Sequence, residues 1–182
     1  GAQLDAILIG SGTINLGSGT GDTINLTSTS SDLNTLGANS NSSIQGVEAI
    51  SAATAAAGVT ITLSGQTEGF SITGSANADT ITGGEGADTI AAGGGNDTIN
   101  LANGDFISGE SIDGGANSDA IVLTNGTTVD FTTGTVTNIE TLTGSTSSDT
   151  ITLSALQLTS LTTVNLVSGF SDTLNVVANG NI

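Results

Sequence analysis

The sequence predicts an all-β chain whose short parallel strands stack into a right-handed solenoid of the β-roll or β-helix type. Three observations favour this fold. A nine-residue pattern repeats three times without a gap between Gly74 and Asn100, short Thr-Ile-x or Thr-Leu-x triplets recur along the chain, and only four aromatic residues occur among 182. A chain with so little aromatic volume builds a poor globular core, whereas thin aliphatic ladders suit coils that stack on their neighbours.

Each of the three nonads ends in a candidate strand. They read GSANADTIT, GGEGADTIA and AGGGNDTIN, with an Asp at the sixth place and an Ile at the eighth. β-branched residues favour strands, and the single large aliphatic residue of each triplet points to one face. Because such strands are too short to be stable alone, we expect two nonads to form one coil of about 18 residues, with a strand on each of two facing sheets.

The pattern becomes less regular outside this run. The stretch Leu101–Asp113 exceeds the nonad count by four residues, which predicts one enlarged coil. Ser43–Thr73 and Thr124–Thr143 lack Gly-Gly turns, and we expect them to form wider coils that close without metal. Helix is expected at most as short turns in Ala49–Ala57 and Leu153–Leu161. Looser nonads lie at Gly17–Asn25, Gly114–Val122, Gly144–Thr152 and Val167–Asn175.

We interpret residues 1–182 as a single β-solenoid domain, with regular nonads at 74–100 and 114–122. A faint long repeat leaves a second interpretation open. Gly46–Ile50 is echoed by Asn138–Leu142, which would fit a duplication into halves near residue 92.

The charge of the chain excludes several function classes. It carries 17 acidic residues and no Lys, Arg or His, so its net charge is −17. Nucleic-acid binding depends on Lys and Arg, as does docking on an anionic lipid surface. No apolar stretch is long enough to span a bilayer. With Cys and Tyr also absent, only carboxylates remain for acid–base chemistry, and most occupy repeat positions, so we do not expect an enzyme.

The nonads resemble the calcium-binding repeats of the RTX (repeats-in-toxin) family, as found in bacterial S-layer proteins and giant secreted surface proteins. The resemblance implies a calcium-binding β-roll with Ca²⁺ as its cofactor. Calcium takes six to eight oxygen ligands, and glycine-rich turns can direct several carbonyls inward. No cation of the chain itself can neutralise the carboxylates.

In the family pattern, an ion lies between stacked turns. One turn gives the carbonyls of places one and three with its Asp, and the next gives those of places two and four with its Asp. Carried over to this chain, one ion would be bound by Gly74, Ala76, Asp79, Gly93, Gly95 and Asp97. On the opposite edge, Gly83, Glu85 and Asp88 would face the irregular turn that contains Asp105. Gly114, Ala116 and Asp119 would begin a further half-site.

The alternative is that these Asp residues only cap turns by accepting hydrogen bonds from nearby backbone N–H groups. That alternative is favoured for Asp22, Asp149 and Asp172, whose turns lack the double glycine. Glu48 and Glu140 are expected to be solvated surface residues.

The expected function is that of an extracellular structural protein, a calcium-dependent self-assembling component of an S-layer lattice or matrix fibre. Millimolar calcium outside the cell can fill weak sites, which favours an extracellular or cell-surface location. We expect the protein to be secreted by a Gram-negative-type bacterium. Any anchor to cell-surface polysaccharide would lie outside this chain. Leu4–Ile9 would either add a strand to a neighbour or cap its own core. The alternative is a calcium-rigidified segment of a secreted adhesin. An ice-binding module, for which the repeats look too irregular, and the RTX region of a secreted enzyme are less favoured.

Overall fold

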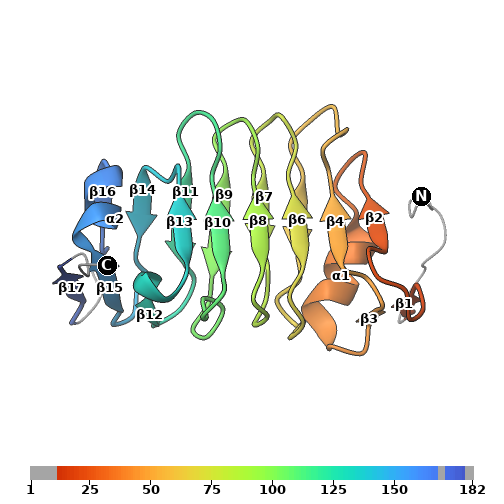
Figure 1. The fold of residues 1–182 in the computed structure, drawn as a ribbon, viewed down its shortest axis with the longest axis horizontal. Helices are drawn as coiled ribbons and strands as arrows, with labels where there is room; N and C mark the ends of the chain where they lie inside the picture. The colour runs from red at the N-terminus through yellow and green to blue at the C-terminus, as the bar shows by residue number, and fades with distance from the viewer. Residues whose placement is uncertain (1–11, 168–170, 179–182) are drawn as a thin grey trace.

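The computed structural model describes residues 12–167 and 171–178, which form a continuous stack of coils (Figure 1). All strand pairs among these residues are parallel. The expected parallel β-solenoid is therefore confirmed.

Two six-stranded sheets run along the stack. Sheet I contains β2 (Thr23–Asn25), β4 (Ala49–Ser51), β6 (Ser71–Thr73), β8 (Thr89–Ala91), β10 (Ser111–Asp113) and β13 (Thr135–Thr137). Sheet II contains β5 (Thr60–Thr62), β7 (Thr80–Thr82), β9 (Thr98–Leu101), β11 (Ala120–Leu123), β14 (Thr141–Thr143) and β16 (Thr163–Asn165).

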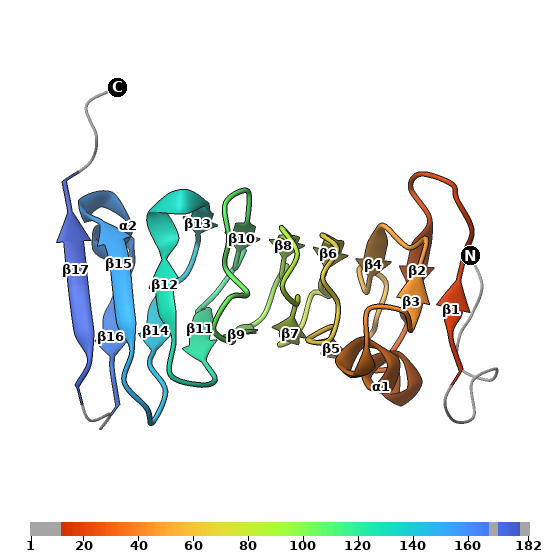
Figure 2. The same ribbon diagram turned by 90° about the horizontal axis from the view of Figure 1, so that it is seen from below.

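Both ends of the solenoid have a third side, whereas the middle coils carry two strands each (Figure 2). Sheet III, at the C-terminal end, contains β12 (Thr128–Asp130), β15 (Thr150–Ser154) and β17 (Thr173–Val177). At the N-terminal end, β1 (Ile14–Asn15) pairs with β3 (Ile44–Gln45). A 3-10 turn, η1 (Phe131–Thr133), follows β12. The regular nonads thus form a two-sided segment between wider, three-sided ends.

The core consists of aliphatic ladders in register. Ile72 of β6 pairs with Ile90 of β8, 18 residues later, which confirms the predicted coil length. Ile90 pairs in turn with Ile112, 22 residues later, which confirms that the intervening coil is enlarged by four residues. All three side chains are buried. Because each coil stacks one Ile on another, the row buries apolar surface along the whole length of the stack.

A helix that the sequence pattern does not predict takes the place of a strand in the first coil. α1 (Ser31–Asn39) begins after Ser30, whose hydroxyl accepts a hydrogen bond from Leu33 N, and it buries Leu33 and Leu36. Its Asn34 side chain covers the edge of β5 by donating to Thr60 O at 3.0 Å and accepting from Thr62 N at 2.9 Å. The N-terminal edge of sheet II is thereby closed.

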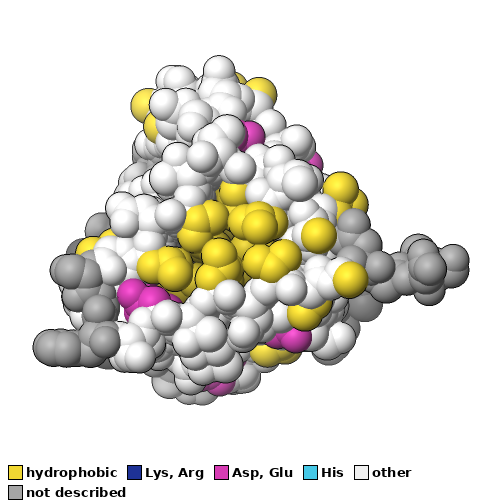
Figure 3. Space-filling view, turned by 90° about the vertical axis from the view of Figure 1, so that its left-hand side faces the viewer, with side chains coloured by type: hydrophobic (Ala, Val, Ile, Leu, Met, Phe, Trp, Pro, Cys, Tyr) yellow, Lys and Arg dark blue, Asp and Glu magenta, His cyan; other side chains and the backbone are white. Residues whose placement is uncertain are grey.

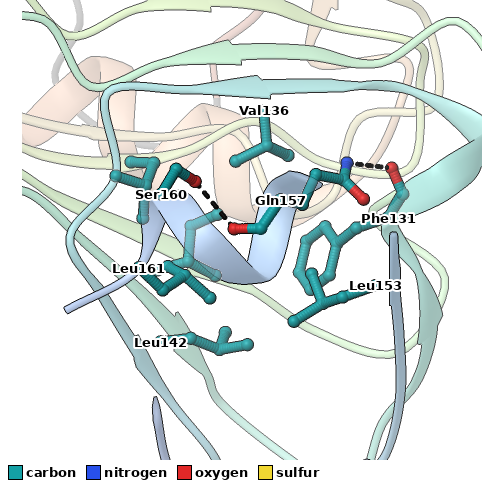
Figure 4. A pocket seen from close by; sticks show the side chains of 9 residues that line it. Phe131, Val136, Leu142, Leu153, Gln157, Ser160 and Leu161 are labelled. Carbon is teal, nitrogen blue, oxygen red and sulfur yellow. Dashed lines mark hydrogen bonds between the residues drawn. The ribbon is translucent and has the colours of Figure 1, made fainter. Parts of the chain in front are cut away.

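The second helix, α2 (Ala155–Ser160), confirms the helical turn expected in Leu153–Leu161. It has a capping box between Ser154 and Gln157, and the Gln157 amide donates to Phe131 O at 2.8 Å (Figure 4). The apolar cavity beneath it measures about 10 Å³, room for one water at most. The helical turn expected in Ala49–Ala57 is wrong, because this segment begins with strand β4, whose Ile50 belongs to the core ladder.

Sheets I and II both continue past residue 92 without interruption. The two halves of the faint long repeat do not lie on equivalent sides, because Glu48 precedes β4 in sheet I whereas Glu140 precedes β14 in sheet II. The division of the chain into one domain or two halves stays a prediction.

Candidate calcium sites

Acidic side chains form a row along the edge where the chain enters sheet II. Asp79 Oδ1 accepts a hydrogen bond from Val59 N at 2.6 Å. Asp97 Oδ1 accepts from Asp79 N and Asp119 Oδ1 from Asp97 N, each at 2.7 Å. Glu140 Oε2 continues the row by accepting from Asp119 N at 2.8 Å. Each carboxylate therefore caps a backbone N–H of the preceding coil, so the capping role left open by the sequence is present.

A second row precedes sheet I. Asp88 Oδ1 accepts from Phe70 N at 2.7 Å, and Glu110 Oε2 accepts from Asp88 N at 3.0 Å. Nearer the N-terminal end, Glu48 Oε2 accepts from Asp22 N at 2.8 Å. A third row precedes sheet III, where Asp149 Oδ1 accepts from Thr127 N at 2.9 Å and Asp172 Oδ1 from Asp149 N at 3.0 Å.

Glu residues fill the role of Asp at three places in these rows, and the expectation that Glu48 and Glu140 are solvated surface residues is wrong. Both are half-buried and cap the coil before them, as Glu110 does. The sequence did contain a signal. Each Glu stands two residues before an inward aliphatic residue, the same spacing that Asp has in the nonads, at Glu48-Ala49-Ile50, Glu110-Ser111-Ile112 and Glu140-Thr141-Leu142.

Three of the carboxylates keep an oxygen without a partner. Asp88, Asp97 and Asp119 are at most 1 % exposed, and the Oδ2 atom of each is buried with no hydrogen bond. A buried charged oxygen without a partner carries a large desolvation penalty. These three atoms are therefore the places where a bound cation would relieve the most unfavourable contacts.

Burial raises the pKa of these carboxyl groups. It raises the pKa of Asp97 to about 6, against the hydrogen bond from Asp79 N and with further increases from the Asp119 and Asp79 carboxylates. It raises the pKa of Asp88 to about 7, with smaller contributions from Asp105 and Glu68. Burial together with the Asp88 and Asp105 carboxylates raises the pKa of Glu110 to about 8. Without a cation, the fold therefore disfavours the fully ionised state of these three carboxyl groups, chiefly because they are buried.

Burial likewise raises the pKa of Asp119 and of Asp105. Hydrogen bonds from Asp97 N to Asp119 and from Ala102 N to Asp105 oppose this rise in pKa, and smaller increases come from Glu140 and Asp113 for Asp119 and from Glu85 for Asp105.

The first glycine of a turn allows the Asp at its sixth place to fold back. A Cβ atom at Gly83 would lie 2.1 Å from Asp88 Oδ2, and one at Gly74 2.5 Å from Asp79 Oδ2. At Gly114 it would lie 2.7 Å from Asp119 Cβ. Contacts this short exclude a side chain at these three first places, whereas Ala92 occupies the first place of the turn that ends at Asp97.

The ligands expected for the first ion meet in two neighbouring turns. Gly74, Ala76 and Asp79 lie in the turn before β7, and Gly93, Gly95 and Asp97 in the turn before β9. The two turns contact each other, since Gly94 N donates to Ser75 O at 3.1 Å. Gly93 O already accepts a hydrogen bond from Ala116 N at 2.9 Å.

The ligands expected for the opposite edge are only partly brought together. Glu85 N donates to Gln66 O, in the coil before it. Asp105 Oδ2 accepts from Ala102 N at 2.7 Å and so caps its own turn. Glu110 caps Asp88 N, and Asp105, whose carboxylate contributes to the raised pKa of Asp88, stays a predicted ligand. The third expected group, Gly114, Ala116 and Asp119, lies in the next coil of the stack, in contact with the turn that ends at Asp97.

A hard divalent cation fits this arrangement. Within the described part of the chain, no three acidic side chains, His or Cys come close enough together to hold a metal alone. An ion would therefore need backbone carbonyls besides the carboxylates, which is the mixed oxygen set that Ca²⁺ accepts. The positive φ angles of Gly84, Gly93 and Gly115 (117°, 108° and 94°) are those of turns that can expose carbonyls in this way.

The comparison with known families agrees with this chemistry. Residues 72–105 match the family model for the RTX calcium-binding nonapeptide repeat, in four copies. No curated protein and no solved structure matches the chain significantly. Residues 72–105 are therefore RTX calcium-binding nonapeptide repeats, and repeats of this family bind Ca²⁺.

Proposed function

We propose that this protein is an extracellular structural component that calcium stiffens and that associates with copies of itself, as in an S-layer lattice or a matrix fibre. The RTX repeat family is generally structural and calcium-binding, and its repeats typically occur in secreted proteins. No helix among the described residues is long and apolar enough to cross a membrane.

The observation that carries the proposal is the C-terminal end of the solenoid. Figure 3 views this end and shows apolar side chains gathered at its centre. Leu161, Val164, Leu166 and Leu174 are only half-buried against the core, and Val176 is 47 % exposed. The end therefore presents core residues that no further coil covers in the described part of the chain.

This end is also poor in charge. Of the 17 acidic residues, Asp172 is the single one after position 149. On its other surfaces, the chain has no cationic side chains to offset its carboxylates. Two copies therefore repel each other wherever the carboxylates of one copy face those of the other. The C-terminal end is a face on which two copies can approach with little repulsion, and among the described residues the outer edges of β16 and β17 have no neighbouring strand.

At the N-terminal end, Asn34 and α1 close the edge of sheet II, while β2 is the last described strand of sheet I. The strand Leu4–Ile9, which the sequence analysis offered for association, lies outside the described residues. We therefore assign the contact between copies to the C-terminal end.

We expect the protein to be monomeric in chelator and to associate as calcium is added, because the ion neutralises carboxylates that otherwise repel. Light scattering across a calcium titration measures this. Val176→Asp, which puts a charge into the apolar end, should abolish association, whereas Ala56→Asp adds the same charge on an exposed lateral turn and should leave it intact. A monomer at every calcium concentration would instead favour a spacer segment of an adhesin.

A second candidate function, ice binding, is favoured by the outer face of sheet II. The strand register aligns one column of five Thr and one Ala, and a parallel column with three further Thr. Strands lie about 4.8 Å apart, and alternate residues along a strand about 6.7 Å, so the hydroxyl groups form a grid that can order water. The first column is Thr60, Thr80, Thr98, Ala120, Thr141 and Thr163. The grid is more regular than the irregular repeats indicated.

Ice binding would show as shaping of ice crystals in the calcium-loaded protein. Thr98→Tyr, in the middle of the first column, should abolish the shaping, whereas Thr89→Tyr on the outer face of sheet I should preserve it. Crystals that grow as in buffer alone would remove this candidate.

A further inference from the structure

Each of the two long sheets is closed by a helix at one end of the stack, and the closed ends are opposite. In the first coil, α1 takes the place of a strand of sheet II beside β5. In the last coil, α2 lies between β15 and β16 in the chain, where the repeating order of the sheets calls for a strand of sheet I. It packs against β13, the last strand of sheet I, and Val136 of β13 lines the same small cavity as Gln157 of α2 (Figure 4). The C-terminal edge of sheet I is therefore covered.

This arrangement disfavours a filament in which one solenoid continues into the next. In a head-to-tail stack, β16 of one copy would meet α1 of the next, and α2 of the first copy would meet β2 of the second. A helix would interrupt each long sheet at the joint, so the edges of β16 and β2 would gain no strand partner there. Two copies are better joined through the same end of both.

The outer edge of β17 can pair with a second copy of itself. Thr173 N donates to Asp149 O at 2.8 Å, so Thr173 directs its backbone groups toward β15. Because neighbouring residues of a strand direct theirs to opposite edges, the N–H and C=O groups of Leu174 and Val176 point away from β15. An antiparallel copy of β17 centred on Asn175 would place Leu174 opposite Val176 of the second copy, and Val176 opposite its Leu174. Both pairs are then of the hydrogen-bonded kind, in which each residue donates to and accepts from the other.

The same register brings apolar side chains together. Leu174 and Val176 align with Ile151 and Leu153 of β15, which are buried in the core, so both point to the inner face of sheet III. Leu174 is half-buried there, whereas Val176 is exposed. In the antiparallel pair, each Leu174 would lie beside Val176 of the other copy on that face. The row of core residues would continue across the joint and cover Val176.

The antiparallel arrangement also keeps the acidic residue of this end away from its equivalent. Asp172 directly precedes β17 and lies three residues before Asn175. With Asn175 on the two-fold axis, the two Asp172 residues lie on opposite sides of it, about 20 Å apart at about 3.4 Å per residue. This separation exceeds the Debye length of about 8 Å at physiological ionic strength. A pair centred on Leu174 would instead place Val176 opposite Asp172 of the second copy.

β17 suits such a contact better than β16, the other open strand of this end. β16 spans Thr163–Asn165, and Thr163 N donates to Glu140 O at 3.0 Å. Within this strand only Val164 then directs its backbone groups outward, so two copies of β16 can exchange hydrogen bonds only at that residue.

We propose that two copies associate through their C-terminal ends, with β17 of one copy pairing antiparallel with β17 of the other about a two-fold axis at Asn175. Sheet III of one copy then continues into sheet III of the other. Because a two-fold contact uses the same surface on both copies, it closes with two chains. This inference rests on the proposed self-association and specifies its geometry: a lattice or fibre is assembled from such pairs, through contacts elsewhere on the chain.

The chain contains no Cys, so a single introduced thiol reports this contact alone. Asn175 is exposed, and in the proposed pair it lies opposite Asn175 of the second copy, with Cα atoms about 4.5 Å apart, a distance that a disulfide spans. In calcium and a mild oxidant, Asn175→Cys should form a covalent dimer on a non-reducing gel. Asn165→Cys makes the same change at an exposed position of β16 and should form little. Equal cross-linking of the two variants, or none in Asn175→Cys, would overturn the proposed pairing.

Hydrogen exchange measures the same contact in the unaltered protein. In calcium, the amides of Leu174 and Val176 should exchange more slowly as the protein concentration is raised, because each then donates to the second copy. The amide of Val164, which points outward from β16 in the same way, should keep its rate. Rates at Leu174 and Val176 that do not depend on concentration, or slowing at Val164 alone, would contradict the proposal.

The two proposals can fail separately. A protein that light scattering shows to be monomeric in calcium defeats both. A protein that associates in calcium, but does not cross-link through Asn175→Cys, defeats only the arrangement about β17.

Discussion

Removal of calcium is expected to lower the melting temperature of this protein more than any other single treatment. In chelator the Oδ2 atoms of Asp88, Asp97 and Asp119 stay buried without a partner, and no Lys, Arg or His can replace the ion. An ion that binds only the folded state at 100 times its dissociation constant adds about 2.7 kcal/mol, and two such ions add about twice that. Because a domain is stable by only about 5–15 kcal/mol, we expect the coils that contain residues 83–119 to unfold in EGTA.

Circular dichroism melting curves with calcium and with EGTA measure this effect. Magnesium is the matched control, since it keeps its water more firmly and demands a tighter octahedral site, so it should restore little of the stability. A melting curve that EGTA leaves unchanged, or that magnesium restores in full, would show that the turns are complete without calcium.

The second large effect concerns pH, whose influence on stability should reverse when calcium is removed. In an unfolded chain, Asp and Glu titrate near pH 4. In the fold, burial raises the pKa of Asp97 to about 6, of Asp88 to about 7 and of Glu110 to about 8. Between pH 4 and 8 the metal-free fold therefore holds protons that the unfolded chain has released. Its stability should fall steadily over this range as the pH rises.

With calcium present the dependence should run the other way, because the carboxylates must lose their protons before they bind the ion. The gain in melting temperature on adding calcium should therefore grow from pH 5 to pH 8. Glu110→Gln mimics the protonated group and should flatten the slope in chelator, whereas Asp130→Asn removes an equal charge from an exposed residue and should not. A metal-free protein that becomes more stable toward pH 8 would contradict this account.

The regular part of the fold could be predicted from the sequence because one local pattern specifies it. Each nonad carries its own turn glycine, its own Asp and its own inward Ile, so the 18-residue coil from Ile81 to Ile99 follows from spacing alone. The enlarged coil could be predicted in the same way, because four residues beyond the nonad count precede Ile112.

The features that the sequence did not reveal depend on contacts between coils. α1 is stabilised by tertiary contacts, in which Leu33 and Leu36 enter the core and Asn34 bonds to a strand 26 residues away. The capping of one coil by the carboxylate of the next is likewise invisible in a single repeat. Asp105 stands one place early in the nonad count and caps its own turn, whereas Glu110, which the repeat pattern does not single out, makes the contact to Asp88 N.

The parallel stacking of the coils also has a mechanical consequence. β1 lies at one end of the stack and β17 at the other, so a pull on the two ends acts across the strands (Figure 1). Hydrogen bonds loaded in this direction break a few at a time, and coils should peel off singly. Each coil along sheet I, 18 to 26 residues long, would release about 60–90 Å of extended chain in place of a rise of about 4.8 Å. Under tension the molecule would lengthen in steps, and an ion joining two coils would set the force at which the next step occurs.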